Sequence, residues 1–113
     1  MQRKILIIDD EEDLCMMIVQ YLVHKDYTVE YAHTLENGMR KLNDMHPDTL
    51  LLDNNLPDGL GWKEADKIQR LYPEMQITLI SANEATPYSI MAYGIGFRKM
   101  EKPITFKTLD TYL

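Results

Sequence analysis

The sequence alternates between short apolar runs and longer stretches in which apolar residues recur at helical spacing. The runs are rich in Ile, Leu and Val and too short for helices, so they indicate strands buried on both faces. Five strands are expected, at residues 4–9, 27–32, 49–53, 76–81 and 97–101. The first helix should end near residues 24–26, and the others should cover residues 34–45, 60–72, 86–94 and 105–113. This alternation predicts an α/β fold, a parallel sheet with helices on both faces.

The first expected helix carries one apolar stripe and further apolar residues beside it. The residues of the stripe, which predict the buried face, are Leu14, Met17, Ile18, Tyr21 and Leu22. The apolar residues off the stripe are Cys15, Met16 and Val19. They either form an exposed surface for a partner or simply widen the contact with the core. The sequence leaves both interpretations open.

Composition excludes several function classes. A chain of 113 residues fits one domain, and its formal net charge of -6 argues against nucleic-acid binding, which needs a basic face. No segment approaches the roughly 20 apolar residues of a membrane span. The single cysteine cannot form an internal disulfide, so nothing depends on an oxidising compartment and a cytoplasmic location is expected.

Polar residues follow four of the five expected strands. These residues are Asp9 and Asp10 after the first strand, Asp53 after the third, Ser81 after the fourth, and Lys102 and Pro103 after the fifth. The carboxyl ends of parallel strands meet at one edge of a sheet, so three carboxylates, a hydroxyl and an ammonium should converge there. Neighbouring carboxylates repel unless a hard cation lies between them, and all-oxygen ligands suit Mg²⁺. The sequence predicts a magnesium site.

Each of these residues also has an ordinary structural explanation. Acids favour the first turn of a helix, and Asp53 could be a turn residue ahead of Pro57. Ser81 could start a helix, and Lys102 could be a solvated surface charge. However, four separate strand ends would then have to supply complementary chemistry by chance. The joint pattern favours a functional site.

Four segments together carry a family resemblance across nearly the whole chain. They are KILIIDDEEDL, HPDTLLLDNNLPDGLG, PEMQITLISA and MEKP. In this order they resemble the signatures of receiver domains of bacterial two-component response regulators. The resemblance implies a flavodoxin-like (βα)5 three-layer sandwich with strand order 2-1-3-4-5, formed as one receiver domain by residues 1–113. The last helix would have about two and a half turns, fewer than is usual in the family, as in a chain truncated before a linker and effector domain.

The resemblance also implies a chemistry. Asp53 would accept a phosphoryl group from a phosphohistidine of a sensor histidine kinase or phosphotransfer protein, and an output domain or effector would receive the signal. The implied Mg²⁺ ligands are the carboxylates of Asp10 and Asp53, the backbone carbonyl of Asn55 and, indirectly, Asp9. Ser81 and Lys102 would contact phosphoryl oxygens. Such a domain catalyses only its own phosphorylation and dephosphorylation and is not otherwise an enzyme.

Two further residues have supporting roles in the family. Ala82 is small enough to leave room for the phosphoryl group and its donor, although a small residue at a strand end is unremarkable in itself. Pro103 follows the lysine at a peptide bond that is usually cis in the family. A cis bond is expected here only on that resemblance.

The chain departs from the family at the approach to the last strand. Receivers usually carry an aromatic residue three positions before the lysine, where it swings inward on activation, and here that position is Lys99. The preceding residues read Gly94-Ile95-Gly96 where the family usually has Ala-Gly-Ala. Phe97 or Met100 would occupy the switch position if the register shifts. The identity of the switch residue stays open.

Three other classes of protein compete with this interpretation. A receiver-like interaction module that acts without phosphorylation is the main alternative, and Lys99 keeps it open. A haloacid-dehalogenase-like phosphatase needs Asp-x-Asp after the first strand, whereas Asp9 and Asp10 are adjacent. A flavin-binding flavodoxin needs a hydroxyl- and amide-rich phosphate loop there, and acids would repel the phosphate.

Overall fold

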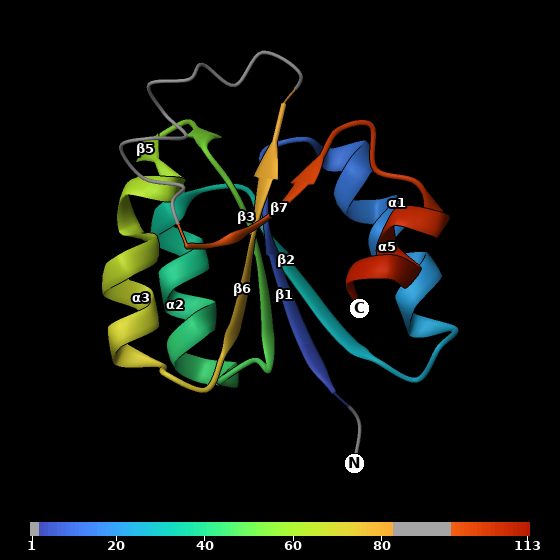
Figure 1. Ribbon diagram of the computed structural model, residues 1–113, viewed down its shortest axis with the longest axis horizontal. Coiled ribbons are helices and arrows are strands. Elements are labelled where there is room, and N and C mark those ends of the chain that lie inside the picture. The colour runs from blue at the N-terminus through green and yellow to red at the C-terminus, as the bar shows by residue number, and fades with distance from the viewer. Residues whose placement is uncertain (1–2, 83–95) are drawn as a thin grey trace.

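A five-stranded parallel sheet forms the centre of the computed structural model, which describes residues 3–82 and 96–113. Its strands are β1 (Lys4–Ile8), β2 (Thr28–Ala32), β3 (Thr49–Asp53), β6 (Gln76–Ser81) and β7 (Arg98–Glu101). Their spatial order is β2-β1-β3-β6-β7. This confirms the predicted order 2-1-3-4-5, in which β1 and β3, the strands that lead into the acids, are neighbours inside the sheet (Figure 1).

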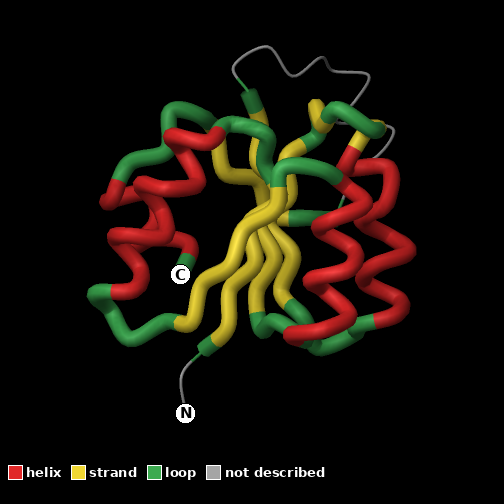
Figure 2. The backbone as a smooth tube through the Cα atoms, turned by 180° about the vertical axis from the view of Figure 1, so that it is seen from behind, coloured by secondary structure: helices red, strands yellow, loops and turns green. Residues whose placement is uncertain are grey.

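Helices cover both faces of the sheet. One face carries α2 (Leu35–Met45) and α3 (Ala65–Leu71), and the other carries α1 (Glu12–Val23) and α5 (Phe106–Tyr112) (Figures 1 and 2). Thr34 caps α2 by accepting a hydrogen bond from the amide of Asn37, and Thr105 caps α5 in the same way from Thr108. The predicted three-layer α/β sandwich is confirmed. None of the helices in the described residues is long and apolar enough to cross a membrane.

The core consists of two clusters, one on each face of the sheet. Alternate residues of β1 divide between them, with Leu6 and Ile8 facing α2 and α3 and with Ile5 and Ile7 facing α1 and α5. All four side chains are at most 1% exposed. Both faces of the sheet are therefore buried, which is why these strands appear in the sequence as unbroken apolar runs.

The structure decides between the two interpretations of the apolar residues beside the α1 stripe. Cys15 is fully buried together with Ile18 and Leu22, and Val19 packs partly buried against the same cluster. A helix that packs against both the sheet and the neighbouring α5 buries a stripe wider than about 100°, so positions beside the predicted stripe are covered as well. Only Met16, which is 40% exposed, fits the exposed surface proposed from the sequence.

The segment after β3 also differs from the prediction. Instead of a helix from residue 60, a small antiparallel hairpin of β4 (Asn55–Leu56) and β5 (Gly59–Leu60) precedes a 3₁₀ turn, η1 (Gly61–Glu64), and then α3. A turn at Pro57 and Asp58 joins β4 to β5. The helix predicted at residues 86–94 lies outside the described residues.

Candidate functional site

The acidic residues meet because β1 and β3 are parallel neighbours. Ile8 pairs with Leu52, so the next residues along the two strands, Asp9 and Asp53, emerge side by side. Asp9 is fully buried, Asp53 is 4% exposed and Asp10 is exposed. One carboxylate oxygen from each of the three lies within 4.8 Å of the others. The structure thus brings together the three carboxylates that the sequence singled out.

Asp9 is held in place through both its side chain and its backbone. Its Oδ1 accepts a hydrogen bond of 2.8 Å from the amide of Glu11. Its carbonyl oxygen accepts one from the thiol of Cys15 at 3.4 Å and lies 2.9 Å from Nδ1 of His33. A carbonyl can only accept, so the His33 contact places a proton on Nδ1. The Glu11 amide therefore orients the Asp9 carboxylate, while Cys15 and His33 hold the Asp9 backbone.

Lys102 reaches the acids from the loop after β7. Its amide donates to the carbonyl of Ser81 at 2.8 Å, which continues the pairing between β6 and β7 past the end of the strand. The Lys102 ammonium lies 3.2 Å from Asp9 Oδ2 and 3.2 Å from Glu11 Oε1, and the side chain is only 16% exposed. The peptide between Lys102 and Pro103 is cis, as the family resemblance implied.

The charges in this site are strongly coupled. Burial raises the pKa of Asp53 to about 7, and the charge of Asp9 adds to this, against the opposing effects of the Lys102 ammonium and the Asn54 amide. Burial likewise raises the pKa of Asp9, opposed by the amide of Glu11 and by Lys102. Burial lowers the pKa of Lys102, but the charges of Asp53 and Asp9 outweigh it and raise this pKa overall. One ammonium does not compensate the carboxylates fully, so the site still favours additional positive charge.

Hydrogen bonds from Gly61 and Trp62 hold the residues on either side of Asp53. The indole Nε1 of Trp62 donates to the carbonyl of Leu52, and the Trp62 amide donates to Oδ1 of Asn54, both at 3.2 Å. The amide of Gly61 donates to the Asn54 carbonyl at 2.8 Å. A Cβ on Gly61 would collide with the backbone carbonyl oxygen of Asp53. No sequence motif indicates these hydrogen bonds, and only the single tryptophan after the turn points to a buried anchor here.

Asp58 connects the β4–β5 hairpin to α2, a role that the sequence did not indicate. From the turn of the β4–β5 hairpin its two carboxylate oxygens accept hydrogen bonds from the amides of Leu35 and Glu36, at 2.8 and 3.0 Å. These amides belong to the first turn of α2, and they lower the pKa of Asp58. The hairpin that contains Asn55 is therefore tied to the neighbouring helix.

The remaining predicted site residues occupy the ends of β6 and of the hairpin. Ser81 is the last residue of β6, is 6% exposed, and its hydroxyl donates to the carbonyl of Ala82 at 3.1 Å. Ala82 is half-buried. Asn55 begins β4, two residues after Asp53, and pairs with Leu60.

The register of β7 is regular. Lys99 pairs with Leu79, and its half-buried side chain donates from Nζ to the carbonyl of Phe97 at 3.1 Å. Met100 is fully buried in the core on the α1 and α5 side, the face opposite to Lys99. Phe97 precedes the strand and packs against the α2 and α3 cluster. No register shift brings Phe97 or Met100 into the position of Lys99.

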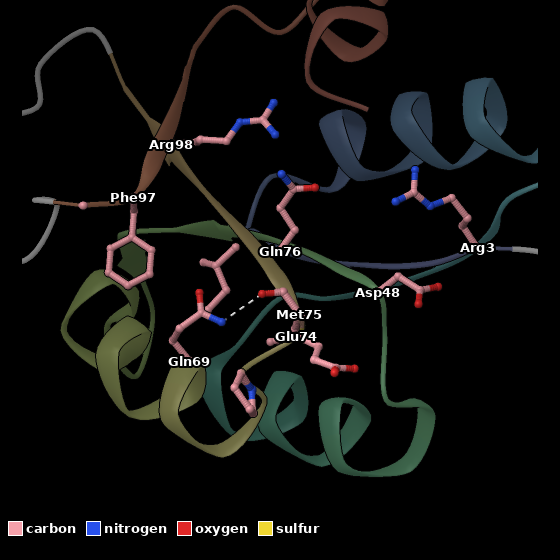
Figure 3. A pocket seen from close by; sticks show the side chains of 11 residues that line it. Arg3, Asp48, Gln69, Glu74, Met75, Gln76, Phe97 and Arg98 are labelled. Carbon is pink, nitrogen blue, oxygen red and sulfur yellow. Dashed lines mark hydrogen bonds between the residues drawn. The ribbon is translucent and has the colours of Figure 1, made fainter.

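A polar pocket of about 520 Å³ lies at the amino-terminal ends of the strands, at the opposite end of the sheet from the carboxylates. It is lined by residues at the amino-terminal ends of strands, among them Arg3, Gln76 and Arg98, and by Phe97 (Figure 3). Among its lining residues, Gln69 donates a hydrogen bond to the carbonyl of Met75 at 2.9 Å (Figure 3). Phe97 therefore lies at the edge away from the carboxylates.

Comparisons with known proteins agree with this geometry. The response regulator receiver domain family matches residues 5–113. The chain is 26% identical over 101 residues to the transcriptional regulatory protein GlrR of Escherichia coli (strain K12), covering 88% of this chain and 23% of GlrR. It is 28% identical over 114 residues to the response regulator GacA of Pseudomonas syringae pv. syringae (strain B728a), covering 89% of this chain and 53% of GacA. The chain thus spans about half or less of these relatives.

A solved structure shares the whole fold. The CheY-like response regulator receiver domain protein from Methanospirillum hungatei JF-1 superposes with a TM-score of 0.88 at 26% identity, covering 99% of this chain and 90% of that one. The match to the family extends over nearly the entire chain and includes all three acidic positions. The chain belongs to the response regulator receiver domain family.

Proposed function

We propose that this chain is a magnesium-dependent phosphoacceptor of a two-component system and that Asp53 is the residue phosphorylated. The observation that carries the proposal is the placement of a nearly buried Asp53 beside Asp9 and Asp10, with the Lys102 ammonium 3.2 Å from Asp9. Family membership supports the same chemistry. Of the three acids, Asp53 alone ends the central strand β3, and Trp62 donates to the carbonyl of the residue before it, Leu52.

The donor set fits a magnesium ion. Three oxygen ligands converge, and buried Asp9 Oδ2 accepts no hydrogen bond of good geometry, although the Lys102 ammonium lies nearby. Asp10 and Asp53 would hold the ion together with the backbone carbonyl of Asn55, and Asp9 would act through water. When bound, magnesium supplies the positive charge that phosphoryl transfer requires.

The reaction that we propose is an in-line displacement at phosphorus. A carboxylate oxygen of Asp53 forms a bond to phosphorus as the bond from phosphorus to the histidine nitrogen of the donor breaks. The electron pair of the broken bond stays on the imidazole, and Asp53 becomes an aspartyl phosphate. Lys102 and the Ser81 hydroxyl, which now donates to Ala82, would turn toward the equatorial oxygens of the transferred group.

The proposal extends to partners and location. The donor would be a sensor histidine kinase or a phosphotransfer protein, and the phosphorylated domain would relay the signal by conformational change to an output domain or effector. A cytoplasmic location follows from the same role. The domain, residues 1–113, would catalyse only its own phosphorylation and dephosphorylation, and the net charge of -6 argues against nucleic-acid binding by this domain.

Labelling by a small phosphodonor tests this function. Wild-type protein incubated with acetyl phosphate and magnesium should gain the mass of one phosphoryl group, and Asp53→Asn should gain none because an amide is a far poorer nucleophile than a carboxylate. Asp44→Asn, an exposed position on α2, is the matched control and should be labelled normally. Labelling of Asp53→Asn would move the site elsewhere, and equal labelling without magnesium would refute the metal assignment.

The same experiment addresses the phosphorylation-independent alternative. The feature that favours this alternative is Lys99, a half-buried lysine where relatives usually carry an aromatic residue. A folded wild-type protein that takes up no phosphoryl group under these conditions would favour a constitutive interaction module.

A further inference from the structure

The Lys102 ammonium is shared by two carboxylates, and Asp53 is not one of them. Asp9 Oδ2 and Glu11 Oε1 each lie 3.2 Å from it. Within the part of the chain that the structure describes, Lys102 forms no ion pair with Asp53, although it senses the charge of Asp53. The cation that the proposed reaction needs at the phosphoryl group is therefore held on the α1 side of the site.

The backbone explains why Glu11 can reach Lys102. Glu11 is the residue before α1, and its side chain does not cap the helix. Instead, its amide donates to Asp9 Oδ1 at 2.8 Å, which fixes the residue beside the site. The side chain then extends across to Lys102 while remaining 57% exposed. A carboxylate this exposed holds its partner only modestly, as suits an ion pair that has to be broken.

We propose that Glu11 is a positioning residue that keeps Lys102 in a resting position and competes with the phosphoryl group for it. This inference rests on the proposed function. Phosphoryl oxygens on Asp53 would draw the ammonium away from Glu11, whereas the buried Asp9 can remain its neighbour. Removing the Glu11 carboxylate should therefore ease the movement of Lys102 and favour the phosphoryl-bound state.

A simpler effect of charge has to be separated from this competition. An acid near the site repels any anionic donor, whether or not it touches Lys102. Glu11→Asp keeps the charge, but its side chain is one methylene shorter and, at the residue before a helix, would bond to helix amides instead. Glu12→Gln removes one charge from the next residue, which is exposed in the first turn of α1. Glu11→Gln removes both the charge and the ion pair.

Two measurements on the magnesium-loaded protein decide the question. The first is the rate of labelling by acetyl phosphate, and the second is the dissociation constant of beryllofluoride, followed by NMR. Glu11→Gln and Glu11→Asp should both label faster and bind beryllofluoride more tightly than wild type, by roughly 1.5- to fivefold. Glu12→Gln should match wild type. Thermal unfolding should confirm that all variants are folded.

Every other pattern overturns the inference. Glu11→Asp behaving as wild type, or Glu12→Gln matching Glu11→Gln, would mean that general charge repulsion is responsible. Unchanged or weaker labelling and binding in Glu11→Gln would mean that Glu11 does not compete for Lys102. A wild-type protein that neither labels nor binds beryllofluoride would instead refute the proposed function, so the two failures are distinguishable.

Discussion

Replacing Asp53 with asparagine should stabilise the protein in the absence of magnesium. The Asp53 carboxylate is nearly buried beside Asp9, and burial raises its pKa from 3.8 to about 7. A pKa that is higher in the folded state means that the folded chain binds a proton more readily than the unfolded chain. The free energy of unfolding therefore falls as pH rises between these two values. Asparagine carries no charge and removes this loss.

The size of the effect follows from the difference between the two pKa values. A change from 3.8 to about 7 is about three pKa units, and each unit corresponds to about 1.4 kcal/mol. Ionised Asp53 thus costs about 4 kcal/mol above pH 7. The amide cannot accept the Asn54 hydrogen bond as strongly as the carboxylate does, so a gain of about 2–4 kcal/mol is expected at about pH 8. Near pH 4 the gain should almost vanish.

This difference in stability is measured across pH by urea unfolding of wild type and Asp53→Asn in a chelating buffer. The fluorescence of the single tryptophan follows the unfolding. Asp44→Asn provides the control for loss of an exposed charge. If Asp53 is a magnesium ligand as proposed, added magnesium should stabilise wild type more than Asp53→Asn. An Asp53→Asn variant no more stable than wild type at about pH 8, or one whose gain persists unchanged near pH 4, would refute the electrostatic reasoning.

Three further predictions test other parts of the structure. Gly61→Ala should lower stability by about 1–3 kcal/mol and weaken magnesium binding, because its Cβ collides with the Asp53 carbonyl; urea unfolding and magnesium titration measure both. Cys15→Glu should unfold the protein or destabilise it by several kcal/mol because Cys15 is buried. Met16→Glu, at an exposed position, should fold and accept a phosphoryl group from acetyl phosphate. It should nevertheless react slowly with the cognate kinase. Lys99 should remain outside the site in a beryllofluoride complex because burying its ammonium costs several kcal/mol, and a crystal structure showing it turned inward against an acid would contradict this.

The sheet and the acidic site could be predicted because each leaves a direct trace in the sequence. Strands buried on both faces appear as apolar runs, such as that of β3, which is buried throughout. Parallel order then places Asp9 beside Asp53 without any knowledge of side-chain contacts. Lys102 joins them because β7 is parallel to β6 and ends at the same edge.

The burial of Cys15 left a weaker trace. Periodicity fixes the direction of an apolar stripe but not its width, which depends on how closely α1 lies against the sheet and α5. The thiol of Cys15 donates to the carbonyl of Asp9, a contact across the helix start that no spacing rule describes. The alternative that these residues widen the core contact is correct for Cys15 and Val19.

The residues that shape the site were missed for a related reason, since they act on backbone atoms. Asp58 bonds to two amides of α2, and Trp62 bonds to a carbonyl of β3. Neither contact needs a particular neighbouring side chain, so no pair of residue types in the sequence indicates it. The ion pair between the side chains of Glu11 and Lys102 was missed because it joins residues from opposite ends of the chain. Motifs identify the groups that react, whereas the position of those groups depends on contacts that only the folded chain reveals.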